Sequence, residues 1–284
     1  MIRVDSLTRT YGDFTAIDQV SFEIGQGEIV GLLGHNGAGK TTIMQMLTGY
    51  LEPSGGRIEI DGLDLATARQ QIQQRIGYLP ENDPLYPEMT VIDYLDFAAA
   101  LHGIDQEVRQ QQILTAMNKT ELTPKATATI ATLSRGYRQR VGVAQAILHN
   151  PRFLILDEPT NGLDPTQVQH MRELIRSLAD EATVIISTHI LQEVQALCDR
   201  VLIIRHGSMA LDASMAELRA GKRIVVEVGG DSERAATLLR AVEGVSSVTS
   251  LNAINSDHPT HRFALDLDQE EELFVSAPRV ARQL

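Results

Sequence analysis

The sequence predicts an α/β fold with a doubly wound parallel sheet. Three short apolar runs, at residues 153–156, 184–186 and 201–204, have the length and composition of strands that are buried on both faces. Helical patterns separate these runs, as the crossover connections of a parallel sheet require. A further apolar run, at residues 29–33, ends at a glycine-rich loop that leads into another helical pattern. In such a sheet, ligands bind at the carboxyl ends of the strands.

The N-terminal part of the chain is expected to form an antiparallel β subdomain. Residues 2–4 and 20–24 alternate between apolar and polar side chains, and a Gly-Gln-Gly turn at 25–27 follows them. Residues 57–62 form another short strand after the turn at 53–56.

The glycine-rich loop reads GHNGAGKTT and matches the pattern G-x4-G-K-[ST]. Glycine permits backbone torsions that turn successive N–H groups toward one anion, and the following helix adds the positive end of its dipole. Lys40 supplies a charge for the β- and γ-phosphates, and Thr41 supplies a hydroxyl for Mg²⁺. These features predict a P-loop NTPase that binds a nucleoside triphosphate. The residues expected to bind it are Gly34, Asn36, Gly37, Ala38, Gly39, Lys40, Thr41 and Thr42.

Residues 90–150 are expected to form a helical subdomain within the α/β chain. Pro80, Pro84 and Pro87 keep the preceding stretch extended and out of helix. Thr90 can then cap a helix, because apolar side chains recur at helical spacing directly after it.

Polar groups from separate stretches are expected to meet at the carboxyl edge of the parallel sheet. One apolar strand ends in Asp157 and Glu158, and another leads to His189. Because the glycine-rich loop also follows a strand at this edge, the three side chains should lie close to the bound phosphates.

The composition changes near Gly221, which divides the chain into residues 1–218 and a small C-terminal α+β domain at 219–284. The predicted order β-α-β-β-α resembles a ferredoxin-like unit that lacks its last strand. We expect the chain to be truncated at Leu284, before this last strand, or a partner to supply the missing edge strand. The strands are expected at 224–228, 245–251 and 262–267, and the helices at 231–242 and 269–283.

Composition and charge narrow the class of protein. The 284 residues carry a formal net charge of −12, which would repel a phosphate backbone, so nucleic acid is not expected as a partner. No apolar run approaches the roughly 18 residues of a membrane span, and the N-terminus lacks the pattern of a signal peptide. Cys198 is the only cysteine, which excludes an internal disulfide and fits a cytoplasmic protein.

Five motifs in the expected order make residues 2 to about 215 resemble the ATP-binding subunit of an ABC transporter. They resemble the Walker A loop (34–41), the signature motif (133–140, LSRGYRQR), Walker B with its catalytic glutamate (154–159, LILDEP), the D-loop (161–164, NGLD) and the switch histidine, His189.

The resemblance implies a role in ATP hydrolysis for each matching residue at the sheet edge. Asp157 and Thr41 would hold Mg²⁺, a cation that prefers oxygen ligands. Glu158 would orient or deprotonate the attacking water. Lys40 and His189 would stabilise the charge that develops on the γ-phosphate.

The resemblance also implies a second copy of the chain. Ser134 and Gly136 begin a helix whose N-terminus can bind an anion, although the chain already has such a site at its glycine-rich loop. In the family, the signature motif faces the nucleotide of a second cassette. Two ATP molecules are therefore expected between two copies, with Lys40 of one opposite Ser134 of the other. Tyr11 matches the aromatic residue that stacks on adenine.

The chain departs from the family pattern at several positions. Glu81 replaces the usual glutamine, and its carboxylate can bind Mg²⁺ directly but adds negative charge near the γ-phosphate. We expect a tighter metal dependence and slower hydrolysis. Arg135 and Tyr137 replace the common glycine and glutamine of the signature motif. Residues 82–87 suit a docking lip for the membrane subunit.

Two classes of function remain open. The first is an ATPase that drives a separate transmembrane permease, located in the cytoplasm and peripheral on the inner face of the cell membrane; the motifs look most similar to those of bacterial exporters. The second is a soluble ABC-type ATPase that acts on ribosomes or DNA, although such relatives usually carry two cassettes or a long coiled coil. Residues 221–284 are interpreted as a ligand-sensing or dimerising module, or as an inert cap.

Overall fold

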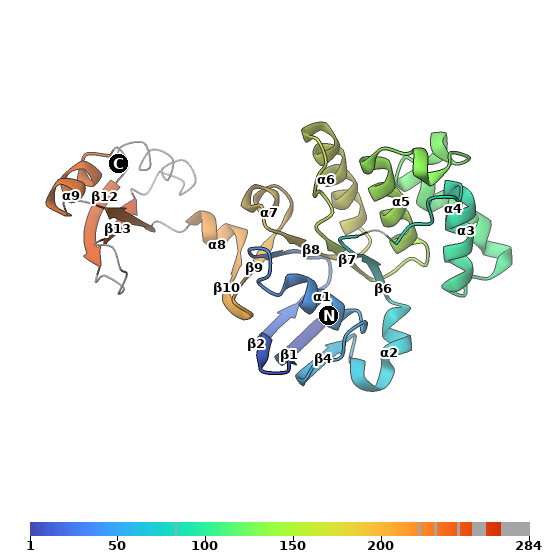
Figure 1. Cartoon of the computed structure of the whole chain (residues 1–284), viewed down its shortest axis with the longest axis horizontal. Coiled ribbons are helices and arrows are strands. Elements are labelled where there is room, and N and C mark those ends of the chain that lie inside the picture. Colours follow the sequence, from blue (N-terminus) through green and yellow to red (C-terminus); the bar gives the residue numbers. More distant parts are fainter. Residues whose placement is uncertain (83, 221–222, 230–231, 243–244, 252–259, 268–284) are drawn as a thin grey trace. The chain divides into compact units, whose positions relative to one another are not determined.

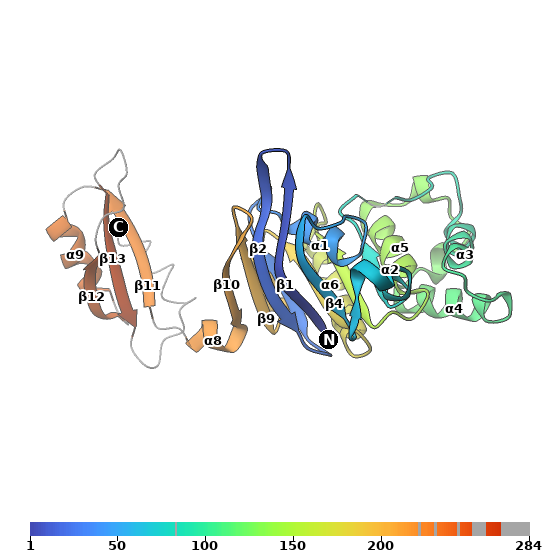
Figure 2. The ribbon, with the colours of Figure 1, turned by 90° about the horizontal axis from the view of Figure 1, so that it is seen from below.

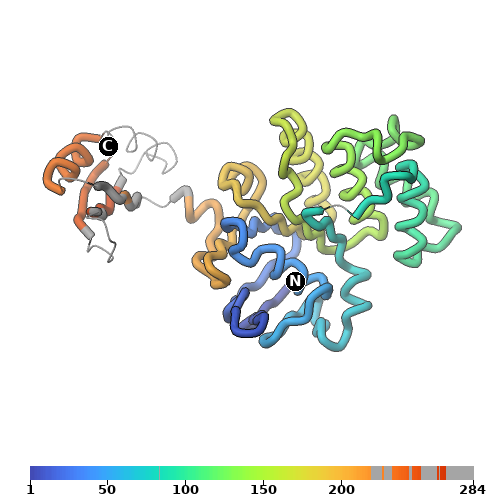
Figure 3. The backbone as a smooth tube through the Cα atoms, in the orientation of Figure 1, coloured from blue at the N-terminus to red at the C-terminus, as the bar shows by residue number. Residues whose placement is uncertain are grey.

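The computed structural model describes residues 1–82, 84–220, 223–229, 232–242, 245–251 and 260–267. The chain divides into two compact units, Met1–Ala213 and Ser214–Leu284. Figure 1 labels elements of both units where there is room, and Figure 3 follows the backbone through them. The boundary predicted at residue 218 falls within α8 (Met215–Ala220), the first helix of the second unit.

A six-stranded sheet forms the centre of the first unit and confirms the predicted fold class. The strand order is β10-β9-β3-β8-β7-β6, and the pairs from β9 to β6 are parallel. Their apolar residues are buried, because helices and a second sheet cover the two faces. The strands are β3 (Ile29–Leu33), β6 (Ile76–Leu79), β7 (Phe153–Asp157), β8 (Thr183–Thr188), β9 (Arg200–Arg205) and β10 (Ser208–Ser214).

One strand of this sheet, β10, was not predicted from the sequence. β10 follows β9 and lies at the edge of the sheet. His206 and Gly207, with φ angles of 49° and 78°, join the two strands in a tight turn. The apolar pattern of β10 is weak because its side chains are exposed or half-buried, so the sequence did not indicate a strand there.

The second sheet is antiparallel, as predicted, with the strand order β2-β1-β4-β5. The register pairs Ile2 with Ile24 on one side and with Ile60 on the other. The strands are β1 (Ile2–Tyr11), β2 (Phe14–Ile24), β4 (Gly55–Ile60) and β5 (Leu63–Asp64). Figure 2 shows β1, β2 and β4 side by side.

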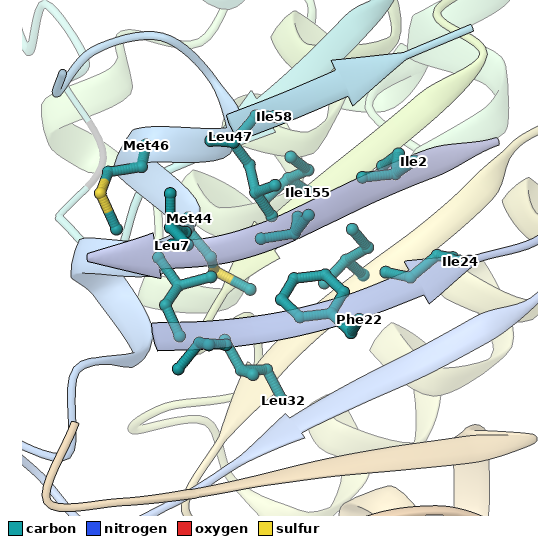
Figure 4. Packing of buried hydrophobic residues seen from close by; sticks show 14 of the residues in the cluster. Ile2, Leu7, Phe22, Ile24, Leu32, Met44, Met46, Leu47, Ile58 and Ile155 are labelled. Atoms are coloured by element: carbon teal, nitrogen blue, oxygen red, sulfur yellow. The ribbon is translucent and has the colours of Figure 1, made fainter. Parts of the chain in front are cut away.

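The main hydrophobic core joins the two sheets through α1 (Lys40–Leu47), the helix that follows the glycine-rich loop. Met44 and Leu47 of this helix pack among Phe22 of the antiparallel sheet and Leu32 and Ile155 of the parallel sheet (Figure 4). Burying a side chain of this size stabilises the fold by about 1.5–3 kcal/mol. The start of α1 is therefore held rigidly at the end of β3.

The predicted helical subdomain contains α3 (Val91–Leu101), α4 (Gln106–Lys119) and α5 (Arg135–Ile147). Thr90 caps α3 as expected, because its side chain accepts a hydrogen bond from Asp93 N–H. α5 approaches β6 closely, since a Cβ on Gly77 would lie 2.2 Å from Ala146 O. The other helical segments are α2 (Leu65–Gln73), η1 (Thr123–Lys125), η2 (Ile130–Thr132), α6 (Pro165–Ala179) and α7 (Leu191–Leu197).

α5, α6 and α7 lie on the opposite side of the parallel sheet from β1, β2 and β4 (Figure 1). Of all the helices within the described ranges, none is both long enough and apolar enough to cross a membrane.

The second unit contains a three-stranded antiparallel sheet with the order β11-β13-β12. Leu239 of α9 packs with Phe263 and Leu265 of β13 in its core. This strand order supports the ferredoxin-like proposal, in which a further strand would pair with β11. The helix predicted at 269–283 lies outside the described residues. The elements are β11 (Arg223–Gly229), α9 (Ser232–Arg240), β12 (Val245–Leu251) and β13 (Thr260–Leu267).

Candidate active site

The glycine-rich loop wraps from the end of β3 to the start of α1. Gly39, the N-cap residue of α1, has a φ of 109°, and a Cβ there would lie 2.3 Å from Ile17 Cδ1. No side chain caps α1, so the free N–H groups of its first turn remain available to an anion. Asn36 and Gly37 are exposed at the tip of the loop, Thr41 and Thr42 are half-buried, and Gly34 and Ala38 are buried.

Lys40 lies folded inside this loop. Its Nζ donates hydrogen bonds to Gly34 O at 2.8 Å and to His35 O at 3.4 Å. The side chain is only 6% exposed and also lies 3.4 Å from Glu158 Oε1. The ammonium group therefore sits between the loop and the end of β7.

Asp157 ends β7 and is fully buried. The parallel register places it beside Ser187, whose hydroxyl donates a hydrogen bond to Asp157 Oδ1. Oδ2 is buried and has no hydrogen-bond partner in the part of the chain that the structure describes. A buried carboxylate oxygen without a partner is costly, and a cation would satisfy it. Asp157 therefore fits a metal-binding role.

Glu158 is the next residue and faces other partners. Its φ of 50° is unusual for a residue with a side chain, and such backbone strain clusters at functional sites. The carboxylate is 3.0 Å and 3.1 Å from His189 Nδ1, in addition to its ion pair with Lys40. His189 itself is 39% exposed. Three sequence-predicted residues thus form one connected group at the sheet edge.

Glu81 lies at the same edge, two residues beyond β6. The pairing of Leu79 with Leu156 places the end of β6 beside the end of β7, and Glu81 is exposed there. Within the described ranges, no group of three His, Cys, Asp or Glu residues forms a metal cage. Mg²⁺ commonly binds one or two carboxylates and takes its other oxygens from water and phosphates. Thr41, Glu81 and Asp157 fit this mode.

Tyr11 ends β1 and is 47% exposed. The Arg9 guanidinium lies over its ring, with Cζ 4.5 Å from the ring centroid. A cation on an aromatic face is attractive, so Arg9 fixes the orientation of the ring.

The structure does not bring Ser134 and Gly136 to the other site residues. Ser134 is exposed and caps α5, accepting a hydrogen bond from Tyr137 N–H at 3.4 Å. Gly136 is buried, and a Cβ there would lie 2.6 Å from Gln167 Oε1. No hydrogen bond or ion pair found within the described ranges joins these two residues to Lys40, Asp157, Glu158 or His189.

Sequence reasoning missed several residues that support the site. Ser187 donates to Asp157 through its hydroxyl and accepts from Glu158 N–H at 3.0 Å. Its position at the carboxyl end of an apolar strand was an available signal. Arg9 lies two residues before Tyr11 on the same face of β1, but this spacing alone does not indicate that the guanidinium lies over the ring.

Comparison with known proteins identifies the family. The ABC transporter family model matches residues 17–161. An uncharacterised ABC transporter ATP-binding protein of Methanocaldococcus jannaschii, MJ1023, is 41% identical over 72% of this chain and 74% of its own. The bacitracin transport ATP-binding protein BcrA of Bacillus licheniformis is 37% identical over 84% of this chain and 78% of its own.

Solved structures show the same relationship. CbiO1 of Clostridium perfringens, part of the ABC transporter complex cbiONQ, is 30% identical with a TM-score of 0.70, over 76% of this chain and 89% of its own. The dimeric bacterial ABC transporter cassette MJ0796 is 25% identical with a TM-score of 0.68, over 76% of this chain and 99% of its own.

Proposed function

The chain belongs to the ABC transporter family as an ATP-binding subunit that hydrolyses ATP, and from this premise we propose that two copies enclose two ATP molecules head to tail and drive a separate permease. The observation that carries the proposal is the separation of the site into two parts. Lys40, Glu158 and His189 are connected within one chain, whereas Ser134 is exposed and, in the part of the chain that the structure describes, no hydrogen bond or ion pair joins it to them. The similarity of this chain to the dimeric cassette MJ0796 supports a second copy that completes the site.

Binding of ATP begins at the glycine-rich loop. The N–H groups at the start of α1 donate to the phosphates, and Lys40 leaves Gly34 O to contact the β- and γ-phosphates. Thr41, Asp157 and Glu81 would hold Mg²⁺, which would supply positive charge against the phosphates. The adenine stacks on Tyr11, on the face of the ring that Arg9 leaves open.

Hydrolysis then uses the pair Glu158 and His189. Once Lys40 turns to the phosphates, the Glu158 carboxylate is free to accept a proton from a water molecule. The water oxygen bonds to the γ-phosphorus, and the bond to the β,γ-bridging oxygen breaks, releasing ADP. The contact of His189 Nδ1 with the Glu158 carboxylate orients the imidazole ring, and Nε2, when it carries a proton, donates to the γ-phosphate. Ser134 and the α5 N-terminus of the second copy bind the same phosphate.

The permease docks at the groove between the helical subdomain and the parallel sheet. A cavity of about 560 Å³ is lined by Tyr50, Tyr78, Leu101, His102 and His149, among others. Tyr50 and Leu101 are 73% and 72% exposed, which favours an apolar partner such as a short helix. Docking to the permease would place this subunit peripherally on the inner face of the cell membrane.

Export is the direction that we assign to the complex. The motif versions resemble those of bacterial exporters, and one relative is a bacitracin transport protein. The match to the ABC transporter family favours a transporter ATPase over an ATPase that acts on ribosomes or DNA.

The test separates ATP binding from dimer formation. A Glu158→Gln variant should form a stable dimer with ATP and Mg²⁺, visible by size-exclusion chromatography with light scattering. Adding Ser134→Glu places a carboxylate against the neighbour's phosphate and should abolish the dimer while monomers still bind ATP. The control adds Gln110→Glu, which introduces the same charge at an exposed position of α4 and should leave the dimer intact. A dimer that persists with Ser134→Glu contradicts the head-to-tail arrangement.

A further inference from the structure

Glu193 is a buried carboxylate that the proposed mechanism does not use. It lies in the first turn of α7 and is 4% exposed, comparable with Lys40, Asp157 and Glu158 of the active site. It makes no ion pair within the ranges that the structure describes. Because burying a charge without a cationic partner is costly, its retention requires specific hydrogen bonds.

Two buried threonines supply these hydrogen bonds. Thr188 Oγ1–H donates to Glu193 Oε2 at 2.7 Å, and Thr160 Oγ1–H donates to Oε1. Thr160 and Thr188 are 5% and 1% exposed, so water does not compete for the hydroxyl groups. Thr188 Oγ1 also accepts a hydrogen bond from Ile190 N–H at 3.1 Å. One carboxylate thereby joins the turn after β7 to the end of β8.

The two threonines flank the catalytic pair along the chain. Thr160 is two residues after Glu158, and Thr188 directly precedes His189. The hydrogen bond between Glu158 and His189 therefore spans two backbone segments. Glu193 bonds to a threonine of each segment. The His189 side chain is 39% exposed, so packing restrains it little and its position depends on the backbone beneath it.

We propose that Glu193 is a positioning residue for ATP hydrolysis, which keeps Glu158 and His189 in register by tethering Thr160 and Thr188. This inference rests on the roles proposed for Glu158 and His189. The Thr188 backbone O accepts a hydrogen bond from Gly34 N–H at 3.4 Å, but in the described part of the chain no side chain of the three tethering residues bonds to residues 34–42. Loss of the tether should consequently reduce the rate of the chemical step and leave ATP binding unchanged.

The experiment compares Glu193→Ala with Glu193→Gln and with Gln192→Ala, an exposed neighbour on the same helix. Steady-state kinetics give kcat, and fluorescence titration with a labelled ATP analogue gives Kd. Since a displacement of about 1 Å can cost roughly 100-fold in rate, we expect Glu193→Ala to lower kcat by about 10- to 100-fold with Kd within about twofold. Glu193→Gln should recover part of the rate, because its amide oxygen still accepts from one threonine. Gln192→Ala should behave as the wild type.

Thr160→Val and Thr188→Val keep the experiment decisive if Glu193→Ala fails to fold. Each removes one hydroxyl with little change of shape and should lower kcat several-fold at unchanged Kd. A kcat within about twofold of the wild type in Glu193→Ala overturns the proposal, as does a parallel loss of kcat, ATP affinity and thermal stability in the variants. Glu158→Gln is measured alongside: if that variant turns over normally, the assigned base is wrong, whereas a normal Glu193→Ala beside an inactive Glu158→Gln rejects the tether alone.

Discussion

The edge of the parallel sheet and the N-terminus of α5 both suit an anion. Within one chain, however, only the sheet edge has several polar side chains gathered around its anion site. At the sheet edge Lys40, Asp157 and Glu158 are each at most 6% exposed and bond to neighbouring groups. At α5, Ser134 is exposed and bonds only locally among the described residues. The sheet edge therefore gathers its polar groups within one subunit, whereas the α5 N-terminus stays accessible, as the proposed head-to-tail dimer requires.

Among the substitutions at the sheet edge, replacing the proposed base should reduce the rate of ATP hydrolysis most. Glu158→Gln removes the proton acceptor but keeps the shape, so kcat should fall by about 10²- to 10⁴-fold with little change in ATP affinity. Single-turnover hydrolysis assays check the rate. Glu107→Gln, at an exposed position of α4, is the matched control. A normal rate in Glu158→Gln would remove the assignment of the base.

The adenine contact should have the next largest effect. Tyr11→Ala removes the stacking surface and should weaken ATP binding by about 1–3 kcal/mol, whereas Tyr11→Phe should retain it. Isothermal titration calorimetry with ATP measures both. Equal affinities for the alanine variant and the wild type would show that Tyr11 does not contact the base. Because Ser134 lies elsewhere, Ser134→Ala should leave this monomer affinity unchanged.

The sequence predicted the polar groups of the sheet edge because their positions follow from simple rules. Asp157, Glu158 and His189 come directly after apolar strands, and the carboxyl ends of parallel strands share one edge. Ser134 was predicted as a cap because a helical pattern follows it.

The supporting contacts could not be predicted in the same way. The hydrogen bond between Ser187 and Asp157 depends on the register of β7 and β8, which no local pattern specifies. Glu193 falls in an ordinary helical sequence, and its burial arises only when α7 packs behind the sheet edge. β10 was missed because its side chains are largely exposed.

Glu81 sharpens the comparison because it is an exposed carboxylate beside the buried Asp157 and Glu158. Glu81→Gln removes a negative charge near the proposed phosphate site and should raise the rate a few-fold and weaken the Mg²⁺ dependence. The effect should be small, since solvent screens an exposed charge. ATPase assays over a range of Mg²⁺ concentrations measure it. Unchanged rate and Mg²⁺ dependence would contradict a role for Glu81 in metal binding.

A pair of histidines lies away from both regions, between the end of α3 and the start of β6, and should affect stability rather than chemistry. The rings of His102 and His149 stack with centroids 4.3 Å apart. Burial, with a smaller contribution from His102, lowers the pKa of His149 from 6.5 to about 4, and burial also lowers the pKa of His102. The unfolded chain therefore binds more protons between these values, so the free energy of unfolding should fall as the pH falls from 6.5 toward 4.

The loss attributable to His149 is at most about 3 kcal/mol. Urea unfolding of the wild type and His149→Gln at about pH 7 and about pH 4.5 should give a difference that shrinks or reverses at the lower pH, because only the wild type must bury or protonate the imidazole. A difference that is independent of pH would contradict this origin.

The close approach of α5 to β6 at Gly77 has a mechanical consequence. The C-terminal end of α5 contacts the backbone of β6 with no side chain between them. If α5 moves, we expect it to pivot about this contact. A push on Ser134 at the far end of the helix, about 20 Å away by its rise per residue, tilts a rigid rod rather than compressing a soft layer. Because β6 runs on toward Glu81, such a tilt would act beside the residues proposed to hold Mg²⁺.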